Sequence, residues 1–272
     1  MSSGVKALIF TKDRPLQCEA LIESLRHYTQ INPFDVHVLY PNQFELYRPT
    51  VCSSSGVHWH GEDGNFDAAL RALFSTAGPF DIDTDAVLLL VDDCIFFRDT
   101  SLRSAAGCLR DNRSVLSFSM RLGLNIRAGP SMVHGSKVSF WRWAAASWHW
   151  GYPFSISCDL HRVSLIREVL ASRDTFTIPN DLESAGVHFC FKNRVPTFNA
   201  MFNGHSVAAC LDANRVQDFH PNAFHGGPEV SAQSLISAYQ QGQRLDWRSY
   251  EGITPGDCFI GDLGVKLVWP TV

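Results

Sequence analysis

The sequence predicts an α/β protein in which helices flank a central sheet, and three observations lead to this prediction. Segments of strand and helix character alternate through the first third of the chain. Residues 86–91 (AVLLLV) are apolar throughout, which is typical of a strand buried on both faces of a parallel sheet. Alternating strands and helices form crossover units with parallel pairing. A length of 272 residues is at the upper end for one continuous core, so we expect one domain with elaborations.

The individual elements follow from composition and periodicity. Residues 5–10 (VKALIF) have strand composition and end at a polar cluster, residues 11–15. Apolar residues then recur at helical spacing from Cys18 to Tyr28, with Asp13 as the expected cap and Pro15 in the first turn. Further strands are expected at 36–40, within 51–59, at 86–91 and at 115–120, and further helices from Asn65 and from about Asp181.

Composition excludes several classes of protein. Hydrophobic residues at 45% and charged residues at 18% indicate a globular chain. The net charge of −4 offers no general basic surface for nucleic acid. No apolar run approaches the roughly 20 residues that span a bilayer, and the first residues are too short and polar for a signal peptide. We therefore expect a cytoplasmic protein whose 8 cysteines, none in a C-x-x-C pair, are reduced core residues.

Two polar features follow predicted strands of the sheet. Residues 11–14 follow the first strand, and Asp92-Asp93 follow the buried strand 86–91. Ligands of such sheets bind beyond the carboxyl ends of the strands. Adjacent carboxylates repel each other unless a cation or hydrogen-bond donors compensate, and their oxygens suit Mg²⁺ or Mn²⁺. A solvent-exposed turn is the alternative, but the immediate return to apolar residues 94–97 favours a binding site.

Other familiar sites are not indicated. The chain lacks the glycine-rich phosphate and dinucleotide motifs, the nucleophile elbow and the H-E-x-x-H pair. Its cysteines and histidines lack the paired spacing of zinc modules. Residues 140–154 hold four tryptophans, which we interpret as core and loop packing rather than as a platform that stacks on an acceptor.

A series of segments in chain order resembles the GT-A glycosyltransferases. They are ALIFTKDRPLQCEALIESL, NFDAALRALF, AVLLLVDDCIF, SFSMRLGLN, WGYPFSIS, IPNDLES and ISAYQQGQRLDW. The pattern is most similar to a bacterial and phage-type group of family 2-like proteins. This resemblance implies one GT-A domain over 1–272 with a Rossmann-like mixed sheet. Its parts would be a nucleotide-sugar half (1–99), an acceptor and catalytic half (100–228), and a C-terminal helix with an irregular tail (229–272).

The resemblance also assigns roles to residues. Thr11, Asp13 and Arg14 would contact the nucleotide base and ribose, Asp63 would complete that pocket, and Asp92 would contact the sugar or ribose. Asp93, with Asp92, would hold the metal ion. A late histidine commonly adds a ligand, and the candidates are His225, His220 and His205. The motif departs from the family pattern at Cys94, since a thiolate is a poor partner for Mg²⁺.

The middle of the chain supplies the expected catalytic groups. Arg121 follows strand 115–120 and precedes Gly123, a residue type that permits close backbone approach to a ligand. Its guanidinium is a candidate clamp for diphosphate or an acceptor hydroxyl, although a structural ion pair is the alternative. Glu183 is the preferred general base, ahead of Asp159, while capping of a helix is the alternative for Asp181 and Glu183.

The resemblance implies an inverting, metal-dependent enzyme that transfers a sugar from a nucleoside-diphosphate sugar to a hydroxyl-bearing acceptor with Mn²⁺ or Mg²⁺. UDP-sugars are the favoured donors. The acceptor stays open, a modified nucleotide included. One alternative is a sugar-nucleotide nucleotidyltransferase, although the chain lacks a glycine-rich basic loop after its first strand. The other is a non-catalytic nucleotide-sugar-binding module, which Cys94 makes worth testing.

Overall fold

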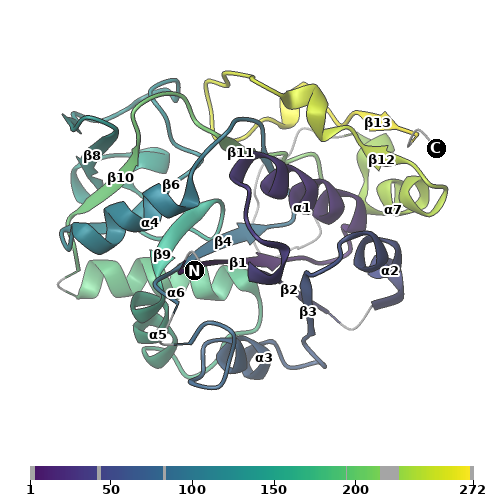
Figure 1. Ribbon diagram of the computed structural model, residues 1–272, viewed down its shortest axis with the longest axis horizontal. Helices are drawn as coiled ribbons and strands as arrows, with labels where there is room; N and C mark the ends of the chain where they lie inside the picture. Colours follow the sequence, from purple (N-terminus) through teal and green to yellow (C-terminus); the bar gives the residue numbers. More distant parts are fainter. Residues whose placement is uncertain (1–3, 42–43, 82–83, 194, 215–226, 270–272) are drawn as a thin grey trace.

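A single large sheet organises the molecule. The computed structural model describes residues 4–41, 44–81, 84–193, 195–214 and 227–269. These residues form a nine-stranded mixed sheet with helices on both faces (Figure 1), which confirms the predicted α/β class and the single domain. Within the described ranges, no helix combines the length and apolar character needed to cross a membrane.

The elements have the following bounds. In spatial order the large sheet contains β3 (His58–Gly61), β2 (Val36–Tyr40), β1 (Val5–Phe10), β4 (Ala86–Val91), β9 (Asp159–Arg162), β6 (Val115–Ser119), β10 (Phe198–Phe202), β8 (Val138–Arg142) and β7 (Val133–His134). Two small pairs are β5 (Cys94–Phe96) with β11 (Ala208–Cys210), and β12 (Arg244–Leu245) with β13 (Leu267–Val268). The helices are α1 (Pro15–Thr29), α2 (Phe44–Ser53), α3 (Phe66–Leu73), α4 (Leu102–Asp111), α5 (Val163–Ala171), α6 (Pro179–Lys192) and α7 (Ala232–Gln240).

The order of the strands creates a switch point between β1 and β4. Strands β3, β2, β1 and β4 are parallel. From β1 the chain proceeds to β2 and β3 on one side, and β4 then returns to the other side of β1. Strand β9 runs antiparallel between β4 and β6, so its amino end lies beside their carboxyl ends. In open α/β sheets a ligand crevice forms at such a point.

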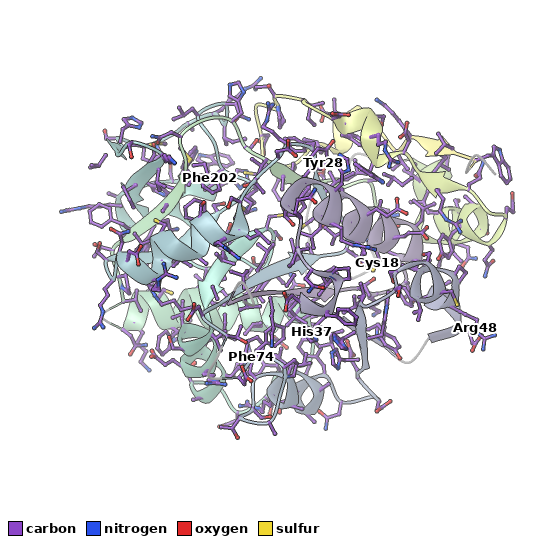
Figure 2. All side chains as sticks on the ribbon, viewed as in Figure 1. Cys18, Tyr28, His37, Arg48, Phe74 and Phe202 are labelled. Atoms are coloured by element: carbon purple, nitrogen blue, oxygen red, sulfur yellow. The ribbon has the colours of Figure 1, made fainter. Side chains whose placement is uncertain are left out.

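The two faces of the sheet bury separate sets of side chains. Along β1, Ala7 and Ile9 join the core cluster that includes residues of α1, α4 and α7. Leu8 and Phe10 point to the opposite face and join the cluster that includes residues of α3, α5 and α6. Figure 1 shows α1 and α4 on one side of the sheet and α3, α5 and α6 on the other. Figure 2 locates Cys18 and Tyr28 on α1, on the side opposite Phe74.

Several local predictions are confirmed. Strands β1, β2 and β4 have the predicted bounds. Asn65 caps α3, since its side chain accepts a hydrogen bond from the backbone N–H of Ala68 at 2.9 Å. Trp141, Trp143 and Trp150 are buried, as core packing requires, whereas Trp148 is 81% exposed. Every cysteine except Cys52 is buried, and none is in a disulfide.

One local prediction is wrong, and another is confirmed only in part. Asp13 does not cap α1: the N-cap is Arg14, which makes no side-chain cap bond, and Asp13 itself has φ of 56°. That left-handed conformation turns the chain away from the capping geometry. The strand expected within 51–59 begins only at His58, because residues 44–53 form α2 despite Pro49.

Candidate functional site

The two predicted polar features meet at the switch point. Arg14 Nη1 donates hydrogen bonds to Asp92 Oδ1 at 2.9 Å and to Asp93 Oδ2 at 3.3 Å. Asp92 Oδ2 accepts from Thr11 Oγ1 and from the backbone N–H of Lys12, both at 3.0 Å. Both oxygens of Asp92 are therefore engaged by the chain, and a metal ion on Asp92 would have to share them with these donors.

The cation that compensates the aspartate pair is Arg14 itself. Its Nε donates to Asn214 Oδ1 at 2.9 Å, and Nη2 donates to the backbone oxygen of Asn214. Burial disfavours the charge of the guanidinium, but Asp92 and Asp93 more than offset this, so the pKa of Arg14 is raised. The chain thus supplies the compensation that adjacent carboxylates need.

Asp93 differs from Asp92 in having a free oxygen. Its Oδ1 is buried and makes no hydrogen bond, while its side chain as a whole is 19% exposed. Burial raises the pKa of Asp93 to about 6, against the attraction of Arg14, with added repulsion from Asp92 and Asp212. Of the two predicted metal ligands, Asp93 is the one with an unused acceptor.

Two aromatic hydroxyls extend this network toward Asp63. The Tyr47 hydroxyl lies 3.1 Å from Thr11 Oγ1 and accepts from the Arg14 backbone N–H at 3.4 Å. The ring of Tyr40 lies 6.0 Å from that of Tyr47, and burial together with Asp63 raises the pKa of Tyr40. Asp63 is exposed, with φ of 47°, in the turn after β3. The predicted nucleotide-contacting residues therefore lie along one edge of the sheet.

A second charged cluster lies at the same edge of the sheet, around Arg121. Asp159, at the amino end of β9, is the register partner of Ser119 in β6, two residues before Arg121. Arg121 and Asp159 are 5% and 3% exposed. Burial lowers the pKa of Arg121, but Cys258 and Asp159, followed by smaller contributions that include Glu183, outweigh it, so the net shift is upward. The structure thus brings Arg121, Asp159 and Glu183 together.

The two acids of this cluster have different environments. Burial raises the pKa of Asp159 to about 6, opposed by Arg121 and by a hydrogen bond from Ser119. Asp159 Oδ1 and Arg121 Nε are both buried without a hydrogen-bond partner. Glu183 Oε1 accepts from Ser155 Oγ at 3.1 Å and from the Ile156 backbone N–H at 3.2 Å. Within this cluster, Asp159 and Arg121 therefore each keep a buried polar atom that the chain leaves unsatisfied.

The two acidic residues near the start of α6, Asp181 and Glu183, have different partners. Asp181 Oδ2 accepts from the backbone N–H of Thr177 at 2.7 Å and of Ile178 at 3.3 Å, so Asp181 is the capping acid. Glu183 instead faces the 155–156 backbone and exchanges a hydrogen bond with the Tyr152 hydroxyl. The capping alternative therefore applies to Asp181 alone.

The chain itself explains the glycine at position 123. A Cβ at this position would lie 2.0 Å from the backbone nitrogen of Ser206 and 2.5 Å from the carbonyl carbon of His205. Glycine is needed there because the backbone of residues 205–206 approaches so closely.

The predicted histidine ligands do not join Asp93 within the described residues. His220 and His225 fall outside those residues. His205 is exposed and belongs to neither group of potential ligand atoms found in the described chain. The ligand atoms that do gather there belong to Asp93, Cys94 and Cys210, which lie within 4.8 Å of one another.

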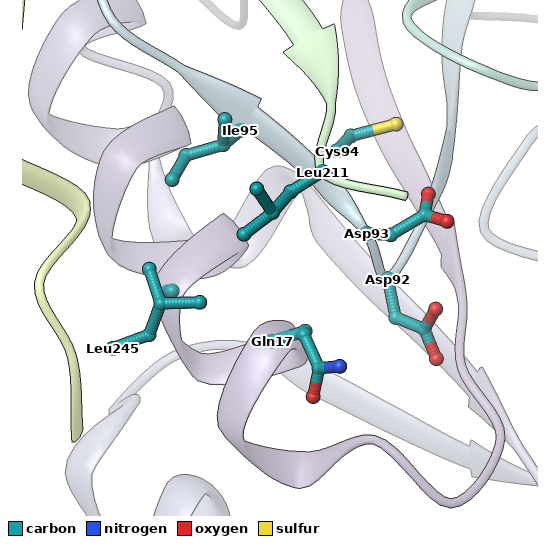
Figure 3. Close-up of a pocket in the computed structure, with 8 residues that line it drawn as sticks. Gln17, Asp92, Asp93, Cys94, Ile95, Leu211 and Leu245 are labelled. Carbon is teal, nitrogen blue, oxygen red and sulfur yellow. The ribbon is translucent and has the colours of Figure 1, made fainter. Parts of the chain in front are cut away.

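Asp93 and Cys94 also line a small pocket. Its walls are Gln17, Ala20, Asp92, Asp93, Cys94, Ile95, Leu211 and Leu245, and its cavity volume is about 10 Å³. Figure 3 shows the Asp93 carboxylate and the Cys94 sulfur pointing to the same side, away from Leu245. A cavity needs about 10–15 Å³ to hold one water molecule, so this pocket has room for a water-sized species and not for an organic ligand.

Sequence reasoning missed Tyr47, Asn214, Asp212 and Tyr152. Tyr47 was assigned to no element, and Asn214 reaches Arg14 across 200 positions of sequence. Asp212 accepts from the Gly261 backbone N–H at 2.7 Å and adds to the negative charge around Asp93. Only Tyr152 gave a signal, because it lies in the segment WGYPFSIS that carries part of the family resemblance.

Comparisons with known proteins yield likeness of fold alone. No family model and no curated protein sequence matches the chain. Among solved structures, TarS of S. aureus is 14% identical with a TM-score of 0.45, over 73% of this chain and 34% of TarS. A 4-diphosphocytidyl-2C-methyl-D-erythritol synthase from Anaerococcus prevotii is 11% identical with a TM-score of 0.46, over 88% and 98% of the two chains. A cytidylyltransferase from Leptospira borgpetersenii is 12% identical with a TM-score of 0.43, over 71% and 77%.

Proposed function

We propose that this protein transfers a sugar from a nucleoside-diphosphate sugar to a hydroxyl-bearing acceptor, with UDP-sugars as the first donors to test. One observation carries the proposal: two charged clusters, one around Arg14 and one around Arg121, share the sheet edge at the switch point between β1 and β4. Ligands of open α/β sheets bind at that edge, and a sugar transfer needs both a donor site and a catalytic acid–base group.

The first cluster supplies the donor site in this proposal. Thr11, Arg14 and the exposed Asp63 would contact the base and ribose, and the half-buried Asp13 lies in the same loop. Asp92 would act chiefly by fixing Arg14, because both of its oxygens already accept hydrogen bonds from the chain. Arg14 in turn offsets the charge of Asp92 and Asp93 and holds the loop after β1 in place, so the residues of that loop would be preorganised for the donor.

The second cluster supplies the catalytic groups. A general base works best when its pKa is near the operating pH. The pKa of about 6 and the unpartnered Oδ1 favour Asp159 for this role, whereas the preferred sequence candidate, Glu183, already accepts two hydrogen bonds through one oxygen. Arg121 would orient the acceptor or the leaving diphosphate through its unpartnered Nε.

A divalent ion fits this proposal in part. The free Oδ1 of Asp93 suits Mg²⁺ or Mn²⁺, while the nearby thiols of Cys94 and Cys210 do not. Such an ion would neutralise charge on the leaving diphosphate, and its other ligands would come from the donor and from solvent.

A non-catalytic nucleotide-sugar-binding module is the second candidate. It is favoured by the closed hydrogen bonding of Asp92 and by the neutralisation of both aspartates by Arg14, which leaves one free carboxylate oxygen for a metal. A sugar-nucleotide nucleotidyltransferase is the third candidate function, and its product with pyrophosphate would be a nucleoside triphosphate.

The test is a screen of nucleoside-diphosphate sugars with and without Mn²⁺ or Mg²⁺, using wild type, Asp93→Asn and Asp159→Asn. We expect release of nucleoside diphosphate by wild type, with loss of at least about 100-fold in kcat for Asp159→Asn. Binding of a donor without turnover would support the module instead. Pyrophosphate-dependent formation of nucleoside triphosphate would support a nucleotidyltransferase.

A further inference from the structure

Two buried thiols meet beside Asp93, and a third lies next to one of them. Cys94 in β5 and Cys210 in β11 are register partners in an antiparallel pair, and their sulfurs lie 3.9 Å apart. Cys158, the residue before β9, shares a hydrogen bond with Cys94. Cys94, Cys158 and Cys210 are at most 2% exposed. Neither charged cluster uses these thiols, so their grouping needs its own explanation.

The spacing of the sulfurs matches a tetrahedral metal ion. Two sulfurs that each lie about 2.3 Å from a tetrahedral zinc ion are about 3.8 Å apart. The 3.9 Å between Cys94 and Cys210 is close to this value. A carboxylate oxygen of Asp93 lies within 4.8 Å of both sulfurs, and Asp93 Oδ1 is buried without a hydrogen-bond partner.

The backbone at Cys158 is held in an unfavourable conformation. Its φ is 64°, in the left-handed region that residues with a Cβ rarely adopt. Two hydrogen bonds fix it there: the Cys158 N–H donates to the Leu89 oxygen at 3.0 Å, and the Cys158 oxygen accepts from the Met120 N–H at 2.9 Å. Conformations of this kind persist where the surrounding structure imposes them, and they gather at functional sites. Here the conformation places a third thiol beside Cys94.

We propose that Cys94, Cys210 and Asp93 form a three-ligand binding site for a thiophilic divalent ion of the zinc class, with solvent in the fourth position. Thiolates select such ions over Mg²⁺ and Mn²⁺, which prefer oxygen. A zinc ion here would take Asp93 Oδ1, the same oxygen that the proposed donor-site ion would use, because Oδ2 accepts a hydrogen bond from Arg14. The two ions are therefore alternatives at this carboxylate, and the zinc site is tested by metal binding and not by sugar transfer.

The thiols need a cation to ionise. Burial raises the pKa of Cys94 well above its usual value, and the hydrogen bond with Cys94 together with burial does the same for Cys210. A bound zinc ion supplies the positive charge, displaces the thiol protons to solvent and bonds to the resulting thiolates. No oxidant or reductant is required.

This site escapes the sequence rules for zinc modules. Those rules look for paired cysteines a few positions apart, and here Cys94 and Cys210 are separated by 116 positions. The pairing of β5 with β11, and not local spacing, brings the ligands together.

The test uses the full-length chain without a histidine tag, reduced and then freed of excess reductant. Zinc is titrated in competition with a chromogenic chelator, and Co²⁺ replaces it for absorption spectroscopy. We expect one zinc ion per chain and a thiolate-to-cobalt charge-transfer band. Loss of an outer contact to a ligand already weakens metal binding about 10- to 100-fold, so Cys94→Ser and Cys210→Ser should weaken it by more than about 100-fold.

Matched controls separate ligation from folding. Cys190→Ser removes a buried thiol on α6 and Cys52→Ser removes an exposed one, and neither should change zinc affinity. If Cys94→Ser lowers stability, the cobalt spectrum of the wild-type protein still shows whether thiolates bind the metal ion. A spectrum without thiolate bands, equal zinc binding in the Ser variants, or a reduced chain that holds no zinc would each overturn the proposal. Retained sugar transfer in a variant that has lost zinc would separate this site from the proposed function.

Discussion

Two arginines are buried in the part of the chain that the structure describes, each among carboxylates at the same edge of one sheet, and they differ in how completely they are bonded. Every guanidinium nitrogen of Arg14 donates a hydrogen bond, to Asp92, Asp93 or Asn214. Arg121 keeps Nε without a partner, and so does Oδ1 of the neighbouring Asp159. The Arg14 cluster is thus a closed network that fixes the loop after β1, while the Arg121 cluster has polar atoms left for a ligand.

This contrast implies that the two clusters contribute to different properties. Removing one partner of a closed buried network leaves an uncompensated charge, which costs stability. Removing an open group from a site that awaits a ligand costs function more than stability, because few native contacts are lost. Substitutions in the two clusters should therefore have separable effects.

The largest expected effect is on stability, at Arg14. Arg14→Met leaves Asp92 and Asp93 buried without their cation, and breaking a buried pair in this way costs about 3–5 kcal/mol. Guanidinium unfolding of the variant and wild type measures the difference. The control is Arg48→Met, which breaks an exposed pair with Glu45 and should cost no more than about 1 kcal/mol. If Arg14→Met and Arg48→Met lost the same unfolding free energy, the buried network around Arg14 would be no more important for stability than a surface ion pair.

The next effect is on activity, at Asp159. Asp159→Asn keeps the shape of the side chain but removes the base, so kcat should fall by about 100-fold or more. The unfolding free energy should change far less than for Arg14→Met. The exposed Asp111→Asn serves as the matched control and should retain full activity. If Asp159→Asn lost as much stability as Arg14→Met and kept the kcat of wild type, Asp159 would have a structural role and not a catalytic one.

The smallest expected effect is on the pH dependence of stability, to which both clusters contribute one aspartate. Asp93 and Asp159 have folded-state pKa values of about 6, above the value of about 3.9 of an unfolded aspartate. Between these values the folded state binds more protons, so their contribution to stability is fully present below about pH 4 and is lost as the pH rises through about 6.

Asparagine variants isolate this contribution. Relative to wild type, Asp93→Asn and Asp159→Asn should each be more stable at pH 7 than at pH 4, by on the order of 2 kcal/mol. Chemical unfolding at the two pH values measures this difference. A variant-to-wild-type difference that stays constant with pH would contradict the raised pKa values.

The parts of the site that were predictable are those set by single strands. The apolar run 86–91 and the polar residues after it located Asp92 and Asp93 at the sheet edge, and the same logic located Thr11 and Arg14. The parts that were not predictable depend on chain segments far apart in sequence. Asn214 and Tyr47 reach Arg14 only in the folded chain, and the thiols of Cys94 and Cys210 meet only because β5 pairs with β11. The prediction that Asp13 caps α1 was wrong because it rested on the side chain alone. The turn around Asp13 imposes a positive φ, which the residue type does not reveal.

Hydrogen exchange in the presence of a nucleoside diphosphate tests the central claim, that the switch-point edge between β1 and β4 is the donor site. Amides of residues 11–14, 61–65 and 92–94 are followed with UDP and Mg²⁺ or Mn²⁺ added, in wild type and in Arg14→Lys, which keeps the charge and loses the forked geometry. We expect slower exchange in these three segments of wild type and a weaker effect in the variant. Unchanged exchange there, with slowing confined to other segments, would contradict the account.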